Sequence, residues 1–124
     1  MKNNIFKSEE GFSIIDYSNT HQHLLLRSTV VNHSEETFYN IDIDFIGVAF
    51  LQIKPQFMGI EINISLDELT KDTLNGDMIF LLKNYSYYKN FEIVTENKTY
   101  HIIATDIKIS QNTLDVNTTS LTKY

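Results

Sequence analysis

His21 and His23 are the residues with the clearest potential for metal chemistry. They lie in the stretch His21–Val31, whose β-branched end favours a strand. Side chains two apart on a strand share a face, so these imidazoles could bind a zinc-like ion together with His33 or Asp16. No motif specifies the third ligand, and two structural histidines at a strand entrance are the simpler interpretation. A metal-dependent enzyme using His21 and His23 therefore ranks behind the hypotheses below.

Asp42 and Asp44 form a second pair with an alternating spacing. Two carboxylates can perform acid–base chemistry when their environments separate their pKa values. Here they alternate with Ile41, Ile43 and Phe45, and this pattern predicts that the carboxylates face water. We expect a solvated acidic face that, together with Glu35 and Glu36 in the preceding polar loop, could contact a partner.

Tyrosines are concentrated in the connection Asn84–Asn90, which contains Tyr85, Tyr87 and Tyr88. Tyrosine supplies rigid contact area at a low entropic cost and is enriched at protein interfaces. Together with Tyr39 of the acidic loop, these side chains are candidate partner-binding residues. The alternative is that they cover one end of a β core.

The chain has no recognisable catalytic motif and no cysteine. It lacks a glycine-rich phosphate loop, a nucleophile elbow and a His-Glu-x-x-His sequence. The absence of cysteine excludes disulfides and thiolate chemistry and fits a reducing compartment. We therefore predict a non-enzymatic protein without a cofactor.

The charge balance disfavours nucleic-acid binding. The formal net charge is −6, and Lys and Arg form no run that could neutralise phosphates. No apolar stretch approaches the length of a membrane span, and the first residues lack the apolar core of a signal peptide. We expect a cytoplasmic protein without membrane contacts, whose acidic surface would suit a basic partner.

The longest apolar segment, Asn40–Ile64, predicts the scaffold. Alternation begins at Ile41, and from Ile46 to Ile53 both faces are apolar, as in a strand covered on both sides. Gly47 marks a bend and Pro55 ends the pairing. A loop through Gln56 and Phe57 would lead to a second strand from Gly59, adjacent and antiparallel to the first.

The remaining patterns predict a single domain over residues 1–124 that is mainly β. Strands are expected at Asn4–Lys7, Phe12–Tyr17, Asp77–Lys83 and Thr113–Thr119, with a hairpin formed by Phe91–Thr95 and Thr99–Ser110. Ser65 and Glu68 form a capping box for a short helix near residues 66–74. About seven to nine strands with regular turn signals indicate an antiparallel sandwich or a barrel-like sheet, with α+β as the alternative. The first and last strands, as edges, could pair between chains.

Three stretches resemble the small β-rich bacterial immunity proteins that neutralise toxins of polymorphic or contact-dependent systems. They are HLLLRS at His23–Ser28, IDIDFIGV at Ile41–Val48, and the run from Pro55 to Ile62. The resemblance spans the first half of the chain and lies in composition rather than in a diagnostic motif. It implies a cytoplasmic binding protein that docks acidic and aromatic side chains on a toxin.

The sequence thus favours a protein-binding domain, with a basic toxin domain as its partner. The alternative is a β domain that binds an apolar small molecule, suggested by the excess of aromatic and aliphatic residues.

Overall fold

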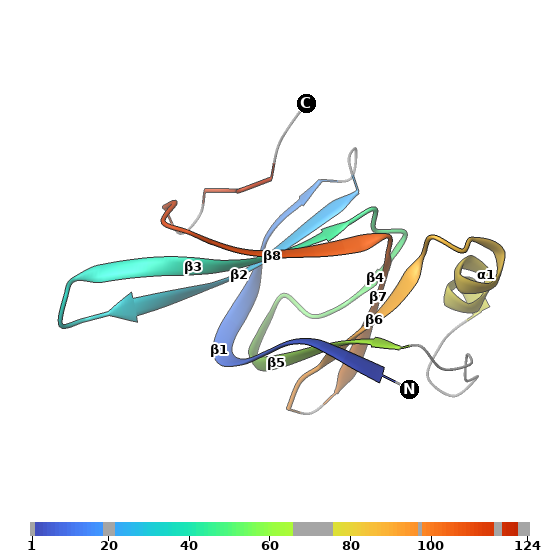
Figure 1. Ribbon diagram of the computed structural model, residues 1–124, viewed down its shortest axis with the longest axis horizontal. Helices are drawn as coiled ribbons and strands as arrows, with labels where there is room; N and C mark the ends of the chain where they lie inside the picture. The colour runs from blue at the N-terminus through green and yellow to red at the C-terminus, as the bar shows by residue number, and fades with distance from the viewer. Residues whose placement is uncertain (1, 19–21, 66–75, 97, 116–117, 122–124) are drawn as a thin grey trace.

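The chain folds into an antiparallel β-sheet with a short helix at one end (Figure 1). The computed structural model describes all residues except 1, 19–21, 66–75, 97, 116–117 and 122–124. The elements in chain order are β1 (Lys2–Ser18), β2 (His23–Asn32), β3 (Thr37–Ile46), β4 (Phe50–Gln52), β5 (Gln56–Ser65), α1 (Gly76–Asn84), β6 (Lys89–Val94), β7 (Thr99–Ala104) and β8 (Asp106–Asn112). The predicted mainly β, antiparallel class is confirmed.

Among the described residues, eight strands follow the order β4-β7-β6-β5-β1-β2-β3-β8. The two strands at the ends of this order, β4 and β8, are each connected to an inner strand by a short bend. β3 continues through Gly47 into β4, and β7 continues through Thr105 into β8. Backbone hydrogen bonds support the bends, from Thr105 N to Ile46 O at 2.9 Å and from Ala49 N to Ile103 O at 2.8 Å. The segments β3–β4 and β7–β8 thus act as two continuous bent strands that pair with each other, β3 with β8 and β4 with β7. The sheet is therefore barrel-like, because its terminal strand β4 continues the inner strand β3 and its other terminal strand β8 continues the inner strand β7.

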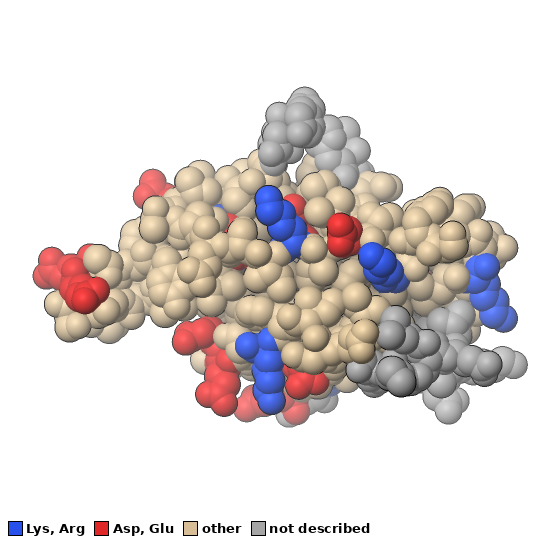
Figure 2. All heavy atoms as spheres, viewed as in Figure 1, with Lys and Arg blue, Asp and Glu red and all other residues tan. Residues whose placement is uncertain are grey.

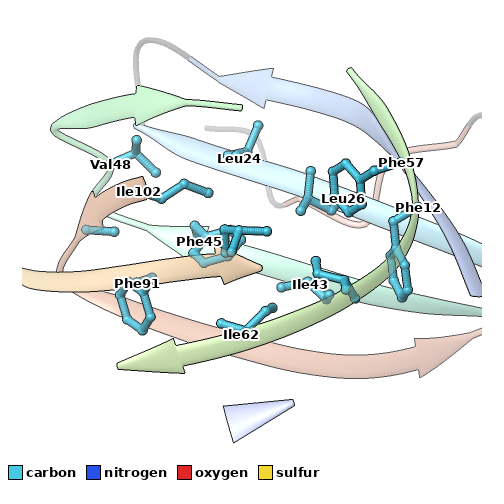
Figure 3. Packing of buried hydrophobic residues seen from close by; sticks show 13 residues of the cluster. Phe12, Leu24, Leu26, Ile43, Phe45, Val48, Phe57, Ile62, Phe91 and Ile102 are labelled. Carbon is cyan, nitrogen blue, oxygen red and sulfur yellow. The ribbon is translucent and has the colours of Figure 1, made fainter. Parts of the chain in front are cut away.

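Apolar side chains from β1, β2, β3, β5, β6 and β7 converge inside the curved sheet (Figure 3). Phe45 and Phe91 meet edge to face with ring centroids 5.6 Å apart, and Phe12 stacks on Phe57 at 6.5 Å. The alternation in the sequence explains this arrangement, since Ile43 and Phe45 point inward from the same face of β3. Burial of these side chains is the main driving force for closing the sheet.

β1 occupies the centre of the sheet, so the prediction of a short edge strand at Asn4–Lys7 is wrong. Its first part pairs with β5 and its second part with β2. Register shifts near Glu9–Glu10 and after Ile14 allow one long strand to serve two neighbours. β5 therefore lies between β1 and β6, and the prediction that it pairs with the strand before Pro55 is also wrong.

The segment around Pro55 is more extended than predicted. β4 ends at Gln52, as expected before a proline, but β5 already begins at Gln56. The predicted loop through Gln56 and Phe57 is therefore absent. The Pro55 carbonyl accepts a hydrogen bond from Ile14 N at 2.9 Å, so pairing with β1 is established at this point.

Residues 77–83 form helix α1, not the predicted buried strand. A short apolar run has no periodicity that separates a buried strand from a helix. Asp77 in the first turn and Lys83 in the last favour the helix through its dipole. Met78 is buried with Ile103 of β7, while Phe80 faces outward. The predicted helix near 66–74 lies outside the described residues, and no described helix has the length and apolarity to span a membrane.

The predicted hairpin is confirmed as β6 and β7, closed by a hydrogen bond from Thr95 N to Lys98 O at 2.9 Å. Its second arm bends at Thr105 and continues as β8. The described residues of the predicted strand Thr113–Thr119 are not a strand; they cross the outer face of β2 and β3, where side chains bind their carbonyls.

Candidate functional site

Three exposed aromatic side chains and one half-buried one form a cluster at the α1 end of the molecule. We define the aromatic cluster as Phe80, Tyr85, Tyr87 and Tyr88. Ring centroids lie 6.4 Å apart for Phe80–Tyr85, 5.6 Å for Tyr85–Tyr87, 5.8 Å for Tyr85–Tyr88 and 4.8 Å for Tyr87–Tyr88. The three tyrosines predicted as partner-binding residues are thus brought together by the structure, and Phe80 joins them.

The end of α1 positions this cluster. Tyr85 N donates to Leu81 O at 3.1 Å, and Tyr88 N donates to Tyr85 O at 3.3 Å, so the chain turns directly after the helix. Asn84 Nδ2 donates to Phe80 O at 2.8 Å and satisfies a carbonyl of the last helical turn. The tyrosines therefore sit on an ordered turn.

One member anchors the cluster and the others are exposed. Tyr88 packs against the small core of Met78 and Ile103 between α1 and the sheet. Phe80 is 58% exposed and Tyr87 56% exposed. Large apolar rings exposed together are unusual on a soluble domain and are typical of a contact surface.

The electrostatics of the cluster favour hydrogen-bond donation. Desolvation, followed by the charges that Tyr88 and Tyr85 would carry if ionised, raises the pKa of Tyr87. The Tyr87 hydroxyl can donate a hydrogen bond, as any protonated phenol can. Lys83 and Lys89 flank the cluster in the sequence and are exposed. The arrangement offers aromatic faces and hydroxyl donors, with two ammonium groups nearby in the sequence, and all of these groups can contact a partner.

Glu35, Glu36 and Tyr39 lie at the opposite end of the long axis from α1, near the turn between β2 and β3 (Figure 1). All three side chains are exposed. Figure 2 shows acidic side chains at this tip. The predicted partner-binding residues therefore do not form one surface.

Asp42 does not face water, and that prediction is wrong. Its carboxylate accepts from Arg27 Nε at 2.6 Å and from Arg27 Nη2 at 2.9 Å, and both side chains are 1% exposed. Asn112 Nδ2 donates to the same carboxylate at 2.6 Å. The alternation placed Asp42 correctly on the outer face of β3, but the C-terminal segment covers that face.

The C-terminal segment is held mainly through its backbone carbonyls. Arg27 Nη1 donates to Thr118 O at 2.7 Å and to Asp115 O at 3.2 Å. Asn40 Nδ2 donates to Leu114 O at 2.9 Å, and Leu121 is buried. Arg27 thus joins the ion pair to the segment above it.

Asp44 lies beside this network and is partly exposed. His23 Nδ1 lies 3.1 Å from Asp44 Oδ1. Burial raises the pKa of Asp44, and the nearby charges of His23 and Lys108 only partly oppose this effect. Asp44 and Lys108 also line a polar cleft of about 440 Å³ under the C-terminal segment, together with Ser110, Gln111, Asn112, Leu114, Thr119 and Ser120.

The metal hypothesis gains no support from the described residues. His21 lies outside them, and His23 faces Asp44. Within the described part of the chain, no group of three or more His, Asp or Glu side chains could hold a metal ion. His23 instead orients toward a carboxylate on the neighbouring strand.

Sequence reasoning missed Phe80 and Arg27. The apolar run at residues 77–83 predicts a buried strand that contains Phe80, and only a helix over residues 76–84 places this ring beside the tyrosines. Arg27 interrupts the apolar face of HLLLRS, and a charged residue in such a run was a signal for a buried partner.

No protein-family model, curated protein or solved structure matches the chain.

Proposed function

We propose that this protein is a non-enzymatic protein-binding domain whose main contact surface is the aromatic cluster. The observation that carries the proposal is the exposure of Phe80, Tyr85 and Tyr87 beside the anchored Tyr88. Tyr85 contacts the other three rings and so joins them into one surface. Tyrosine and phenylalanine are enriched at protein interfaces, and tyrosine is among the side chains that most often dominate the binding energy there.

We further propose that the partner is a bacterial toxin domain, making this chain an immunity protein. The resemblance at His23–Ser28 and Ile41–Val48 and the net charge of −6 support this assignment. An acidic protein would associate faster with a basic toxin, because complementary charges steer the encounter.

The first experiment measures binding to the protein encoded by the neighbouring gene. That protein is co-expressed with the wild-type chain and with the double variant Tyr85→Ala/Tyr87→Ala. We expect co-purification with the wild type and at least about tenfold weaker binding by the variant. Tyr17→Ala is the matched control, since Tyr17 is also exposed but lies in the last part of β1, outside the aromatic cluster. Equal binding by both variants would contradict the proposed surface.

The second experiment tests toxin neutralisation directly. The neighbouring gene is expressed in a host with and without this chain, and growth is followed. Growth that is inhibited without the chain and restored with it supports an immunity function. Equal growth in both conditions would leave protein binding intact but contradict the toxin assignment.

A second candidate function is binding of an apolar small molecule. Side chains fill the inside of the sheet, so the relevant feature is a surface cleft of about 480 Å³ lined in part by Phe12, Phe57 and Met58. Met58 is 67% exposed at this cleft. Titration with an apolar fluorescent dye checks this function; saturable binding that Met58→Glu abolishes supports it, and no saturable signal contradicts it.

A further inference from the structure

The distal part of the β2–β3 hairpin extends beyond the rest of the sheet (Figure 1). We define residues 28–39 as the β2–β3 arm. β1 last pairs with β2 at Arg27, and β8 last pairs with β3 at Asn40. Beyond these positions β2 and β3 pair only with each other among the described strands. The outer edge of β2 from Ser28 to Asn32 is therefore not paired with any described strand.

The arm also exposes apolar side chains along both of its faces. Val31 is 51% exposed and lies directly opposite Phe38, so these two side chains share a face. Tyr39 is exposed on the other face, opposite Val30. Natural sheet edges are commonly protected by lysine, proline or a bulge. The arm has no Lys and no Pro, and its β2–β3 pairing continues without a register shift.

The charge of the arm selects the kind of segment that could pair with it. Glu35 and Glu36 lie at the turn, and residues 28–39 contain no Lys or Arg. Figure 2 shows acidic side chains and no basic ones at this tip. A strand that added to this edge would gain from lysine or arginine facing the glutamates and from apolar residues facing Val31 and Phe38.

The turn is ordered by its own hydrogen bonds. Asn32 Oδ1 accepts from Ser34 N at 3.2 Å, from Ser34 Oγ at 2.8 Å and from Glu35 N at 3.3 Å. An incoming strand would therefore meet an edge that requires little further ordering, which lowers the entropic cost of binding.

We infer that the outer edge of β2 in the β2–β3 arm binds an extended, basic segment of a partner protein by strand addition. Ser28 is buried, so backbone hydrogen bonds along Thr29–Asn32 supply the affinity. The two glutamates with Val31 and Phe38 supply selectivity. This surface lies at the opposite end of the molecule from the aromatic cluster, so the inference does not depend on the proposed function.

The experiment uses a synthetic peptide of alternating lysine and valine, seven residues long with blocked ends. It is titrated into the full-length isotope-labelled protein and followed by amide NMR. We expect shift changes and slowed amide exchange that are concentrated in Thr29–Asn32. A peptide of the same sequence with alternate backbone nitrogens methylated keeps the charge but cannot form the ladder, and we expect it to bind at least about tenfold more weakly.

Matched variants separate the arm from general electrostatic attraction. Glu35→Gln/Glu36→Gln removes two charges from the arm, and Glu9→Gln/Glu10→Gln removes two exposed charges from β1. We expect about tenfold weaker peptide binding for the first pair only, with unchanged amide spectra outside the altered segments in both.

Three results of the peptide experiments would overturn the inference, and so would one result obtained without peptide. The first is equal binding of the methylated peptide, the second is equal weakening by both pairs of variants, and the third is a response that maps away from the arm. A concentration-dependent dimer without peptide, weakened by Val31→Lys in the arm, would identify a second copy as the occupant and would also overturn it.

Discussion

Arg27 and Asp42 form a doubly hydrogen-bonded ion pair between β2 and β3, and the C-terminal segment covers it. The pair is directly opposed in the register of the two strands. Two buried charges are tolerated only when each is neutralised and hydrogen-bonded. Here Asn112 Nδ2 donates a further hydrogen bond to the Asp42 carboxylate. The Arg27 guanidinium donates to the carbonyls of Asp115 and Thr118.

Removing one partner of this pair should strongly destabilise the protein. Asp42→Asn leaves the Arg27 charge buried without a counter-ion, and we expect a loss of about 3–5 kcal/mol in the free energy of unfolding. Urea denaturation followed by circular dichroism measures this loss. Glu61→Gln is the control, because the Lys7–Glu61 pair spans 3.9 Å at the surface and should contribute at most about 1 kcal/mol. Similar losses for the two variants would contradict the structural role of Arg27–Asp42.

The pH dependence of stability should differ between Asp42 and Asp44. Burial alone would raise the pKa of Asp42, but hydrogen bonds from Arg27, Ser120 and Asn112 outweigh it and lower this pKa below 3.8. A carboxyl with a lowered pKa stabilises the folded state above its unfolded pKa, and this contribution is lost as pH falls through the folded pKa. The contribution of Asp44 to stability has the opposite sign. Because its pKa is raised in the folded state, its ionisation lowers the free energy of unfolding as pH rises above 3.8.

Unfolding measurements between about pH 2 and pH 7 test this contrast. Asp42→Asn should remove part of the stability gained on raising the pH from the acid range. Asp44→Asn should steepen the net gain, because it removes an opposing contribution. Parallel pH curves for the two variants would contradict the assigned directions.

The sequence predicted the outward direction of Asp42 but not its burial. Alternation reports which face of a strand a side chain occupies, and it does so correctly for Ile43 and Phe45. Whether an outer face meets water depends on chain that returns from far along the sequence, here residues 113–115 and 118–121. The interaction between Arg27 and Thr118 spans 91 positions, and no local pattern encodes it.

Gly47 occupies a position that other residues can take only with strain. Its φ of +66° lies in the left-handed region, and a Cβ there would stand 2.4 Å from Thr105 Oγ1. We expect Gly47→Ala to cost about 2–4 kcal/mol, from backbone strain together with the steric conflict. Gly59→Ala is the matched control, because Gly59 has φ of +76° but its nearest contact is an ordinary 3.8 Å.

Thermal or urea unfolding of both glycine variants separates the two causes. Gly59→Ala should cost only about 1–2 kcal/mol from backbone strain. Adding Thr105→Ala to Gly47→Ala removes the conflicting side chain, so the double variant should be more stable than the sum of the two single changes predicts. If the stability changes of the two single variants add up to that of the double variant, the Thr105 side chain does not conflict sterically with a residue at position 47.

The sequence predicts the bend at Gly47 but not the helix at 76–84, because the bend depends on a local backbone requirement and the helix depends on packing. A glycine within a strand pattern marks a local backbone requirement that the residue itself reveals. The run Met78–Leu82 is short and apolar, and its conformation depends on packing against Phe50 and Ile103 rather than on its own periodicity. The tyrosines after it were predicted as contact residues, but their clustering with Phe80 required the helix.

Tyr87 and Tyr88 should separate binding from stability. Tyr88 packs against Met78 and Ile103, so Tyr88→Ala should reduce the free energy of unfolding by about 1–2 kcal/mol. Tyr87 is 56% exposed, and Tyr87→Ala should change stability by less than about 0.5 kcal/mol. Urea unfolding of both variants gives these values, and affinity for the neighbouring gene product is measured on the same preparations. If Tyr87→Ala leaves the free energy of unfolding unchanged, a loss of affinity in this variant reports contact with the partner. A stability loss equal to that of Tyr88→Ala would instead show that both rings belong to the core.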